Sequence, residues 1–214
     1  MGQKINPNGF RVGVNRAYLS SWYAQDKKSY SKYLAQDTKL KGIVKQKLSN
    51  AGLASVKILR NINSITVEIT VSRPGVVIGR GGAGIETLKK ELDRLMKTTV
   101  DIKILEAKDP NSIAVLIAKN VGDQIVRRIA PKIAISRELE NAKQCRDLKG
   151  LRIAVSGRIK GAEIARTEKA QFGTIPLQTL RADIDYAFEY FQVPNAGIQG
   201  IKVWAYKGEK MGYE

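Results

Sequence analysis

A short glycine-rich loop carries the residue types that point most directly to chemistry in this chain. Gly79 and Gly82 enclose Arg80 and Gly81, directly after a short apolar turn. Glycines at such positions let the backbone approach a polyanion closely, because no Cβ stands in the way. Leucines at helical spacing follow, and a helix that starts there adds free N–H groups and the positive end of its dipole. The pattern predicts that Gly79, Arg80, Gly81 and Gly82 contact the phosphates of a nucleic acid.

The residues around this loop predict three half-buried strands. Apolar and polar residues alternate over 65–71 and over 100–104, and a preceding strand begins at 56–58. Alternation with a period of two is the pattern of a strand that buries one face. Asn61-Ile62-Asn63 is expected to form the turn between the first two strands.

One helix is expected before these strands, from a cap at Asp37 to Gly52, and another after the glycine loop. The resulting order is helix, strand, strand, helix with Gly-x-x-Gly, helix and strand. It resembles the type II KH domain, in which such a loop clamps the backbone of about four nucleotides. The alternative is an α+β domain whose glycines only form a tight turn.

The charge balance favours a polyanionic partner. Lys and Arg number 37 against 20 acidic residues, which gives a net charge of +17 in 214 residues. Such an excess repels itself in the compact state and is typical of proteins that bind nucleic acid. The first half carries most of it, with 20 basic and 8 acidic residues over 1–108.

The rest of the composition argues against catalysis. The chain has no His and a single Cys, Cys145, so it offers no His-based acid–base chemistry, no zinc knuckle and no internal disulfide. We therefore expect no enzyme activity, no cofactor, no metal and no small-molecule substrate. No apolar run reaches the length of a membrane span, so a cytoplasmic protein without a membrane partner is expected.

Residues 1–36 are expected to be irregular and basic. Aromatic residues are interleaved with lysines there, namely Trp22, Tyr23, Tyr30 and Tyr33. Such a mixture suits stacking on bases and pairing with phosphates. The alternative is that the aromatic side chains cover the edge of a domain, and both can hold at once.

The remaining chain predicts two helices on one face of a four-stranded, mainly antiparallel sheet. Asp109 and Pro110 are expected to open one helix, and a second is expected from Lys132 to about Leu148. Alternating residues predict four strands, over 151–156, 163–168, 180–186 and 201–206.

Five motifs occur in the order in which they stand in one protein family. They are residues 1–13 (MGQKINPNGFRVG), 77–82 (VIGRGG), 155–168 (VSGRIKGAEIARTE), 179–186 (TLRADIDY) and 200–209 (GIKVWAYKGE). Together they resemble the bacterial type of the small-subunit ribosomal protein S-three family, over essentially the whole chain.

The resemblance implies a structural protein of the head of the small ribosomal subunit. Such a protein binds small-subunit ribosomal RNA beside proteins S-ten and S-fourteen. It also lines the messenger RNA entrance with S-four and S-five and helps to unwind structured messenger without hydrolysing ATP. The implied division is an RNA-contacting arm over 1–16, a type II KH domain over 17–108, an α+β domain over 109–208 and a short tail over 209–214.

The resemblance also implies which basic residues contact RNA. Candidates for ribosomal RNA are Lys4, Arg11, Arg16, Arg158, Lys160 and Arg166. For Arg166, and more so for Arg181, the alternative is pairing with acidic residues inside the sheet.

Candidates at the messenger entrance are Arg127, Arg128, Lys132 and Arg137, for which the alternative is a merely solvated basic face. Many relatives carry adjacent arginines where this chain has Ile133 and Ala134. Lys132 and Arg137 therefore remain for the entrance role on that helix.

Two other classes of function are weighed against this one. A free KH-type RNA chaperone or ribosome assembly factor would account for residues 37–108, but not for the motifs at the two ends. An enzyme could present Asp183 and Asp185 on one face of a strand, since residues two apart point the same way. Without His or a further carboxylate cluster, these aspartates are better explained as partners of nearby arginines.

Overall fold

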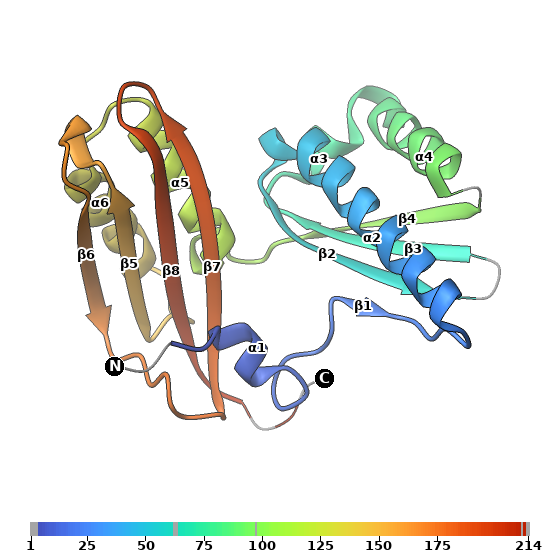
Figure 1. Ribbon diagram of the computed structural model, residues 1–214, viewed down its shortest axis with the longest axis horizontal. Coiled ribbons are helices and arrows are strands. Elements are labelled where there is room, and N and C mark those ends of the chain that lie inside the picture. Colours follow the sequence, from blue (N-terminus) through green and yellow to red (C-terminus); the bar gives the residue numbers. More distant parts are fainter. Residues whose placement is uncertain (1–3, 62–63, 97, 211, 213–214) are drawn as a thin grey trace. The chain divides into compact units, whose positions relative to one another are not determined.

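The computed structural model describes residues 4–61, 64–96, 98–210 and 212 (Figure 1). The chain divides into two compact units. The central unit comprises Tyr18–Lys108, and the C-terminal unit comprises Asp109–Glu214 together with Met1–Ala17. Each unit combines a sheet with helices, which confirms the predicted α+β class.

The sheet of the central unit contains the three predicted strands and a short additional one. The strands are β1 (Ser20–Ser21), β2 (Leu53–Arg60), β3 (Ser64–Val71) and β4 (Thr99–Glu106), in that spatial order. β2 and β3 are antiparallel, whereas β1 pairs with β2 and β4 pairs with β3 in parallel. β1 has two residues, which is too few to show the apolar–polar alternation that predicts a strand. The predicted turn at Asn61-Ile62-Asn63 lies partly outside the described residues.

Helices α2 (Lys27–Lys47) and α4 (Ala83–Met96) supply the other half of this core. α3 (Pro74–Ile78) and the 3₁₀ turn Arg80–Gly82 precede α4, and a second 3₁₀ turn, Ser49–Ala51, follows α2. Each fully buried aliphatic side chain contributes about 1.5–3 kcal/mol. The buried residues at helical spacing are Leu40, Val44, Leu88, Leu92 and Met96.

The predicted start of α2 at Asp37 is wrong, because that carboxylate has other partners. Asp37 lies in the middle of the helix and is buried, and the helix begins after Asp26. Arg60 Nε donates to Asp37 Oδ1 at 3.0 Å, and Trp22 Nε1 donates to Oδ2 at 2.8 Å. The same guanidinium lies over the Tyr33 ring, 4.9 Å from its centroid.

Residues 22–36 are accordingly more ordered than predicted. Trp22 packs against Tyr30 and Tyr33, with ring centroids 5.3 and 5.6 Å apart. Trp22 and Tyr33 are half-buried in this cluster, as the second of the two interpretations of this segment expects. Tyr23 and Tyr30 are exposed, at 85% and 53%, so for them the first interpretation stays a prediction.

The C-terminal unit has four antiparallel strands with two helices on one face (Figure 1). In spatial order the strands are β6 (Arg166–Gly173), β5 (Gly150–Gly157), β8 (Gly197–Glu209) and β7 (Ala182–Val193). The helices are α5 (Ala114–Val126) and α6 (Pro131–Lys143). The predicted sheet and helices are confirmed, although β6 starts later, β7 and β8 are longer, and α6 ends earlier than predicted.

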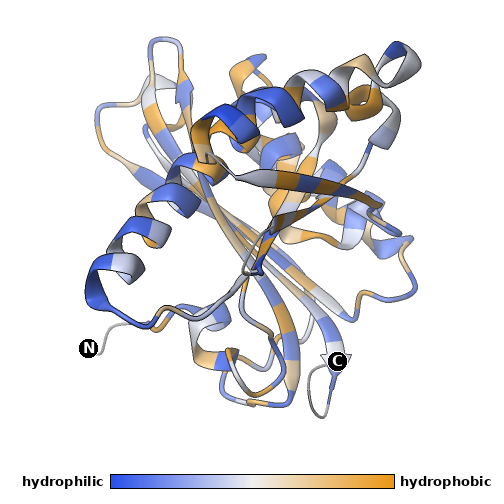
Figure 2. Cartoon of the chain, turned by 90° about the vertical axis from the view of Figure 1, so that its right-hand side faces the viewer, coloured by the Kyte–Doolittle hydropathy of each residue, from blue (hydrophilic) through white to orange (hydrophobic). Residues whose placement is uncertain are grey.

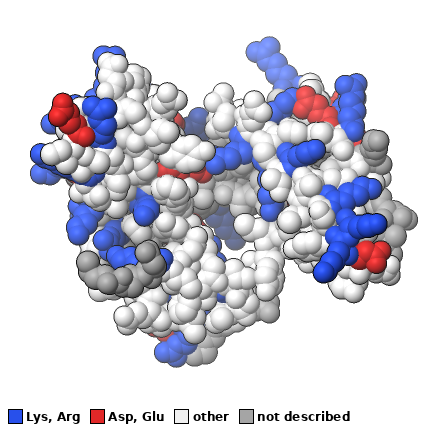
Figure 3. Space-filling model, viewed as in Figure 1, with Lys and Arg blue, Asp and Glu red and all other residues white. Residues whose placement is uncertain are grey.

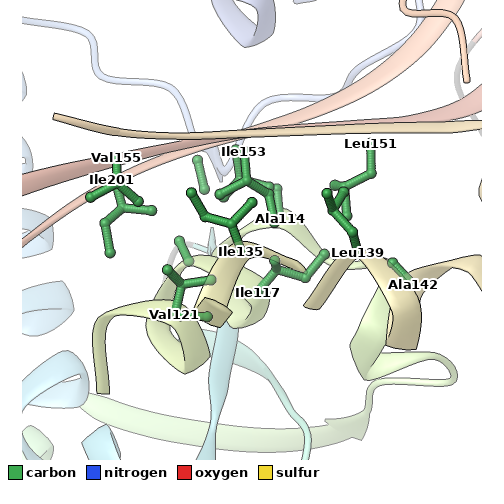
Figure 4. Packing of buried hydrophobic residues seen from close by; sticks show 14 of the residues in the cluster. Ala114, Ile117, Val121, Ile135, Leu139, Ala142, Leu151, Ile153, Val155 and Ile201 are labelled. Atoms are coloured by element: carbon green, nitrogen blue, oxygen red, sulfur yellow. The ribbon is translucent and has the colours of Figure 1, made fainter. Parts of the chain in front are cut away.

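The core of this unit lies between the sheet and the two helices (Figure 4). Figure 4 shows side chains of α5 and α6 meeting those of β5 and β8. Residues of opposite hydropathy are interspersed along the helices and strands in Figure 2, as expected for elements that bury one face. The core residues with the most complete burial include Ile117, Val121, Ile135, Leu151, Ile153, Val155 and Ile201.

The predicted helix start at Asp109-Pro110 is also wrong. Pro110–Ser112 forms a 3₁₀ turn, and α5 begins after Ile113. The first N–H of the helix, on Ala114, donates to Asp185 Oδ2 of β7 at 2.8 Å. The capping carboxylate therefore comes from a strand 71 residues away in the sequence, which a local pattern cannot reveal.

The described residues before the central unit, 4–17, fold onto the C-terminal unit. A one-turn helix, α1 (Pro7–Arg11), is capped by the Asn6 side chain and contacts β7. Asn8 makes two hydrogen bonds to the backbone of Tyr186, one to its carbonyl and one from its N–H. Asn15 Nδ2 donates to the carbonyls of Leu180 and Ala182.

Candidate nucleic-acid interface

The glycine loop joins α3 to α4 with three residues in the left-handed region. Gly79, Gly81 and Gly82 have φ of 69°, 63° and 84°. A residue with a Cβ is strained in this region, so glycine is required by the path of the backbone. Gly79, Arg80 and Gly81 are exposed. The loop therefore presents backbone and one cationic side chain to the solvent, as a phosphate-binding loop must.

Gly84, in the first turn of α4, holds the two helices at close approach. A Cβ at this position would lie 2.5 Å from the carbonyl oxygen of Val77 and 3.1 Å from that of Ile78. No sequence pattern distinguishes Gly84, because its role depends on how α3 and α4 cross, which local residues do not specify. It fixes the direction in which α4 leaves the loop.

The surface beside the loop combines a cation with apolar side chains. Arg80 has no ion-pair partner among the residues that the structure describes. Val76 and Ile78 are 58% and 39% exposed. An exposed guanidinium next to exposed aliphatic groups suits a ligand that has both phosphates and bases.

A second basic group lies in the C-terminal unit, at the turn between α5 and α6. Arg127, Arg128, Lys132 and Arg137 are all exposed. Ile133 is half exposed, whereas Ala134 is fully buried against the core. A longer side chain at position 134 would therefore meet the core of this chain, so the charge of this surface comes from the flanking residues.

The structure brings Arg128 and Lys160 together around one cavity of about 450 Å³. Asn195, from the turn between β7 and β8, completes one side of it. Arg128, Lys160 and Asn195 are the three non-glycine residues with positive φ in the described part of the chain, with φ of 66°, 55° and 66°. Strained backbone of this kind persists where the surrounding structure imposes it and is common at functional sites. No acidic residue lines the cavity, so it favours an anionic group.

The structure contradicts one candidate for RNA contact, Arg11. Its side chain is fully buried, at 0% exposure, and donates to five backbone carbonyls of the C-terminal unit. The closest are Ala182 O at 2.7 Å and Thr179 O at 2.9 Å. Burial lowers the pKa of this guanidinium, and the nearby Arg16 lowers it further. Arg11 organises the fold and cannot reach a phosphate.

The other candidates differ in how far they are free to bind. Arg16 is held by Asp185 at 2.8 Å, and Arg158 donates to the carbonyls of Gly161 and Ala162. Lys4 and Arg166 are exposed. The expected pairing of Arg181 is not found among the described residues, because Asp183 and Asp185 face Lys210 and Arg16 instead.

Features typical of a metal centre, a reactive thiol or a membrane-spanning helix are absent from the described residues. Within the described part of the chain no three His, Cys, Asp or Glu residues cluster as metal ligands. Burial raises the pKa of the Cys145 thiol, which disfavours the reactive thiolate. No described helix has the length and apolar character needed to cross a membrane.

Positive charge is spread over the surface that surrounds these features. Figure 3 shows lysine and arginine side chains at many points of one face and far fewer acidic ones. An excess of positive charge of this kind attracts polyanions in general.

Comparison with known proteins identifies the family. Residues 39–112 match the family described as KH domain, and residues 121–205 match Ribosomal protein S3, C-terminal domain. The two matches together span both units. Curated uS3 proteins are 44–46% identical to this chain over at least 98% of its length. The chain belongs to the small ribosomal subunit protein uS3 family.

Curated uS3 proteins cover the whole length of the chain. The uS3 protein of Clostridium acetobutylicum is 46% identical over 210 residues, which is 98% of this chain and 93% of the relative. Those of Desulforamulus reducens and Pelagibacter ubique are each 44% identical, over 98% and 100% of this chain and 93% of each relative. The KH and S-three resemblances drawn from the motifs are thereby confirmed.

Proposed function

We propose that this uS3 chain is a structural constituent of the small ribosomal subunit that binds ribosomal RNA in the head of that subunit. The observation that carries the proposal is the exposed glycine loop, set between α3 and α4 within a chain of uS3 sequence. Its chemistry is pairing of Lys and Arg with phosphates and release of counterions, without bond-making. Proteins S-ten and S-fourteen are the expected neighbours.

We propose a second contact, with messenger RNA, at the turn between α5 and α6. Arg128 and Lys160 line a cavity without acidic residues. Arg127 directly before it in the chain, and Lys132 and Arg137 of α6, are exposed. Phosphates held there would keep a messenger strand extended as it enters, beside S-four and S-five. Helping to unwind messenger in this way needs no ATP hydrolysis by the chain.

Sedimentation of tagged protein tests the ribosomal role. Protein that migrates with the small subunit in a lysate gradient, and stays there through a high-salt wash, is the expected result. Protein found at the top of the gradient, or removed by modest salt, would favour the free RNA chaperone.

A matched pair of variants tests the glycine loop. Arg80→Asp with Gly81→Asp places carboxylates where phosphates should lie, and Asp tolerates the left-handed backbone at position 81 better than most residues. Ser31→Asp with Lys32→Asp changes the net charge equally on the exposed surface of α2. The first pair should weaken RNA binding well beyond the second. Equal losses would mean that the loop contributes only charge.

The messenger contact is tested by unwinding. Subunits assembled with Lys132→Ala and Arg137→Ala should open a messenger hairpin more slowly than the unaltered subunits. Unchanged opening would remove these two residues from the proposed role.

A further inference from the structure

The sheet of the C-terminal unit has a second face, opposite the one that α5 and α6 cover. The register places Tyr186 opposite Trp204, Phe188 opposite Lys202 and Tyr190 opposite Gly200. The residues between them, such as Ala187 and Val203, point to the helices and belong to the core. Because successive side chains alternate between faces, this aromatic series lies on the outer face.

Two aromatic rings of this outer face are strongly exposed, whereas Tyr186 and Trp204 are half-buried. Phe188 is 53% exposed and Tyr190 is 68% exposed. A Cβ on Gly200 would lie 3.1 Å from Cε2 of Phe188, so the absence of a side chain there lets the ring lean over the backbone of β8. Large rings left in water at successive positions of one strand mark a binding surface.

Cations accompany these rings. The Arg152 guanidinium lies 5.2 Å from the centroid of the Trp204 ring, and Lys202 Nζ lies 5.8 Å from that of Phe188. Tyr186, Phe188 and Tyr190 each begin a row of paired residues that runs across the sheet from β7 through β8 and β5 to β6. One of these rows ends at Lys169, and none of the three contains an acidic residue. A protein partner that docked through apolar contact would not need this one-sided charge, whereas a polyanion would.

We propose that this outer face binds a single-stranded segment of RNA, in addition to the contacts proposed above. Bases stack on Phe188 and Tyr190, and phosphates pair with Arg152, Lys169 and Lys202. Open sheets that expose aromatic rings beside basic residues bind RNA in this manner, because every base has a face that can stack.

The test measures binding of a fluorescein-labelled twelve-nucleotide oligouridine to the full chain by fluorescence anisotropy. The Arg80→Asp, Gly81→Asp variant serves as the background, so that the glycine loop does not mask a second site. Two double variants are compared in it, Phe188→Leu with Tyr190→Leu and Phe188→Ser with Tyr190→Ser. Ile164→Ser with Leu180→Ser removes exposed apolar side chains elsewhere in the unit and is the matched control.

If bases stack on the rings, the Leu and the Ser double variants should weaken oligouridine binding alike, by about fivefold or more for each stacked base that is lost. The control variant and the exchange Phe188→Tyr with Tyr190→Phe should bind as the background does. Lys202→Ala should lower the dependence of log K on log salt by about 0.7, because one phosphate contact disappears.

Two outcomes would overturn the proposal. If the two Ser substitutions weaken oligouridine binding and the two Leu substitutions do not, the rings act only as apolar surface and not by stacking, which is the behaviour of a docking surface suited to a protein. Equal binding by all the variants would show that RNA does not use this face. Neither outcome bears on the ribosomal role, which the sedimentation experiment decides separately.

Discussion

Replacing Arg11 should unfold the C-terminal unit more easily without acting on RNA directly. Arg11→Met keeps most of the side-chain volume and removes every donor. The carbonyl of Ala182 keeps a partner, because Asn15 Nδ2 also donates to it at 3.1 Å. The carbonyl of Thr179 also keeps a partner, the N–H of Ala182 at 3.3 Å, whereas those of Pro176 and Leu177 lose the donor seen at 3.4 and 3.0 Å.

The magnitude follows from these two orphaned acceptors. A buried polar group left without its partner costs about 1–3 kcal/mol. Relief of the buried charge offsets part of this, since burial already lowers the pKa of Arg11. We expect a net loss of about 2–4 kcal/mol, which is a large fraction of the total of about 5–15 kcal/mol that stabilises a typical domain.

Urea unfolding followed by circular dichroism and tryptophan emission measures this loss. Trp204 lies in the C-terminal unit and Trp22 in the central one, so a Trp22→Phe background leaves Trp204 as the reporter of the C-terminal unit. Arg127→Met, at an exposed position, is the matched control and should change stability by less than about 0.5 kcal/mol. The reasoning is refuted if Arg11→Met leaves the unfolding midpoint of the Trp204 signal unchanged while RNA binding falls.

Three further predictions concern packing, capping and pH. Gly84→Ala should destabilise the central unit, because about 1–3 kcal/mol of crowding against Val77 O exceeds the ~1 kcal/mol that Ala gains over Gly in a helix. Gly42→Ala should stabilise the same unit, because a Cβ there meets nothing within 4 Å. Equal unfolding midpoints of the two variants in urea would contradict both predictions. Asp185→Ala should cost about 1–2 kcal/mol through loss of the α5 cap and the Arg16 pair. Asp147→Ala, at an exposed position, should cost less than about 0.5 kcal/mol. Burial raises the pKa of Glu138, so this carboxyl favours folding below its unfolded pKa and opposes it once it ionises. Glu138→Gln should therefore raise the melting temperature at pH 8 and lose that advantage at pH 4, and a constant difference across this range would exclude the buried carboxylate as its cause.

What the sequence predicts well in this protein is what neighbouring residues decide. The alternation over 65–71 and the spacing of Leu88 and Leu92 are set by which face of an element is buried, so they identify strands and helices directly. The glycine loop is equally local, since its backbone needs positive φ whatever surrounds it. The family motifs lie in both units, so the resemblance that they carry predicts the fold class of each.

The wrong predictions share one cause, which is a partner far away in the chain. Asp37 looks like a helix cap but serves Arg60, and Asp109 looks like one but the cap of α5 is Asp185. Arg11 looks like an exposed basic residue because nothing near it reveals carbonyls at 176–182. The aromatic outer face was available as a signal, because Tyr186, Phe188 and Tyr190 alternate, but the predicted strand ended at Tyr186.

The contact of residues 4–16 with β7 has a consequence for how the protein is made. The C-terminal unit is interrupted in sequence, and the whole central unit is inserted between its first segment and the rest. During synthesis the central unit can fold as soon as residues 18–108 are free, since domains generally fold as units from the N-terminus. The first segment must wait until β7 at 182–193 has been made. Until then Arg11 is a solvated cation on an undocked segment of the nascent chain, and it becomes a buried part of the fold only after Ala182 and the rest of β7 have been made.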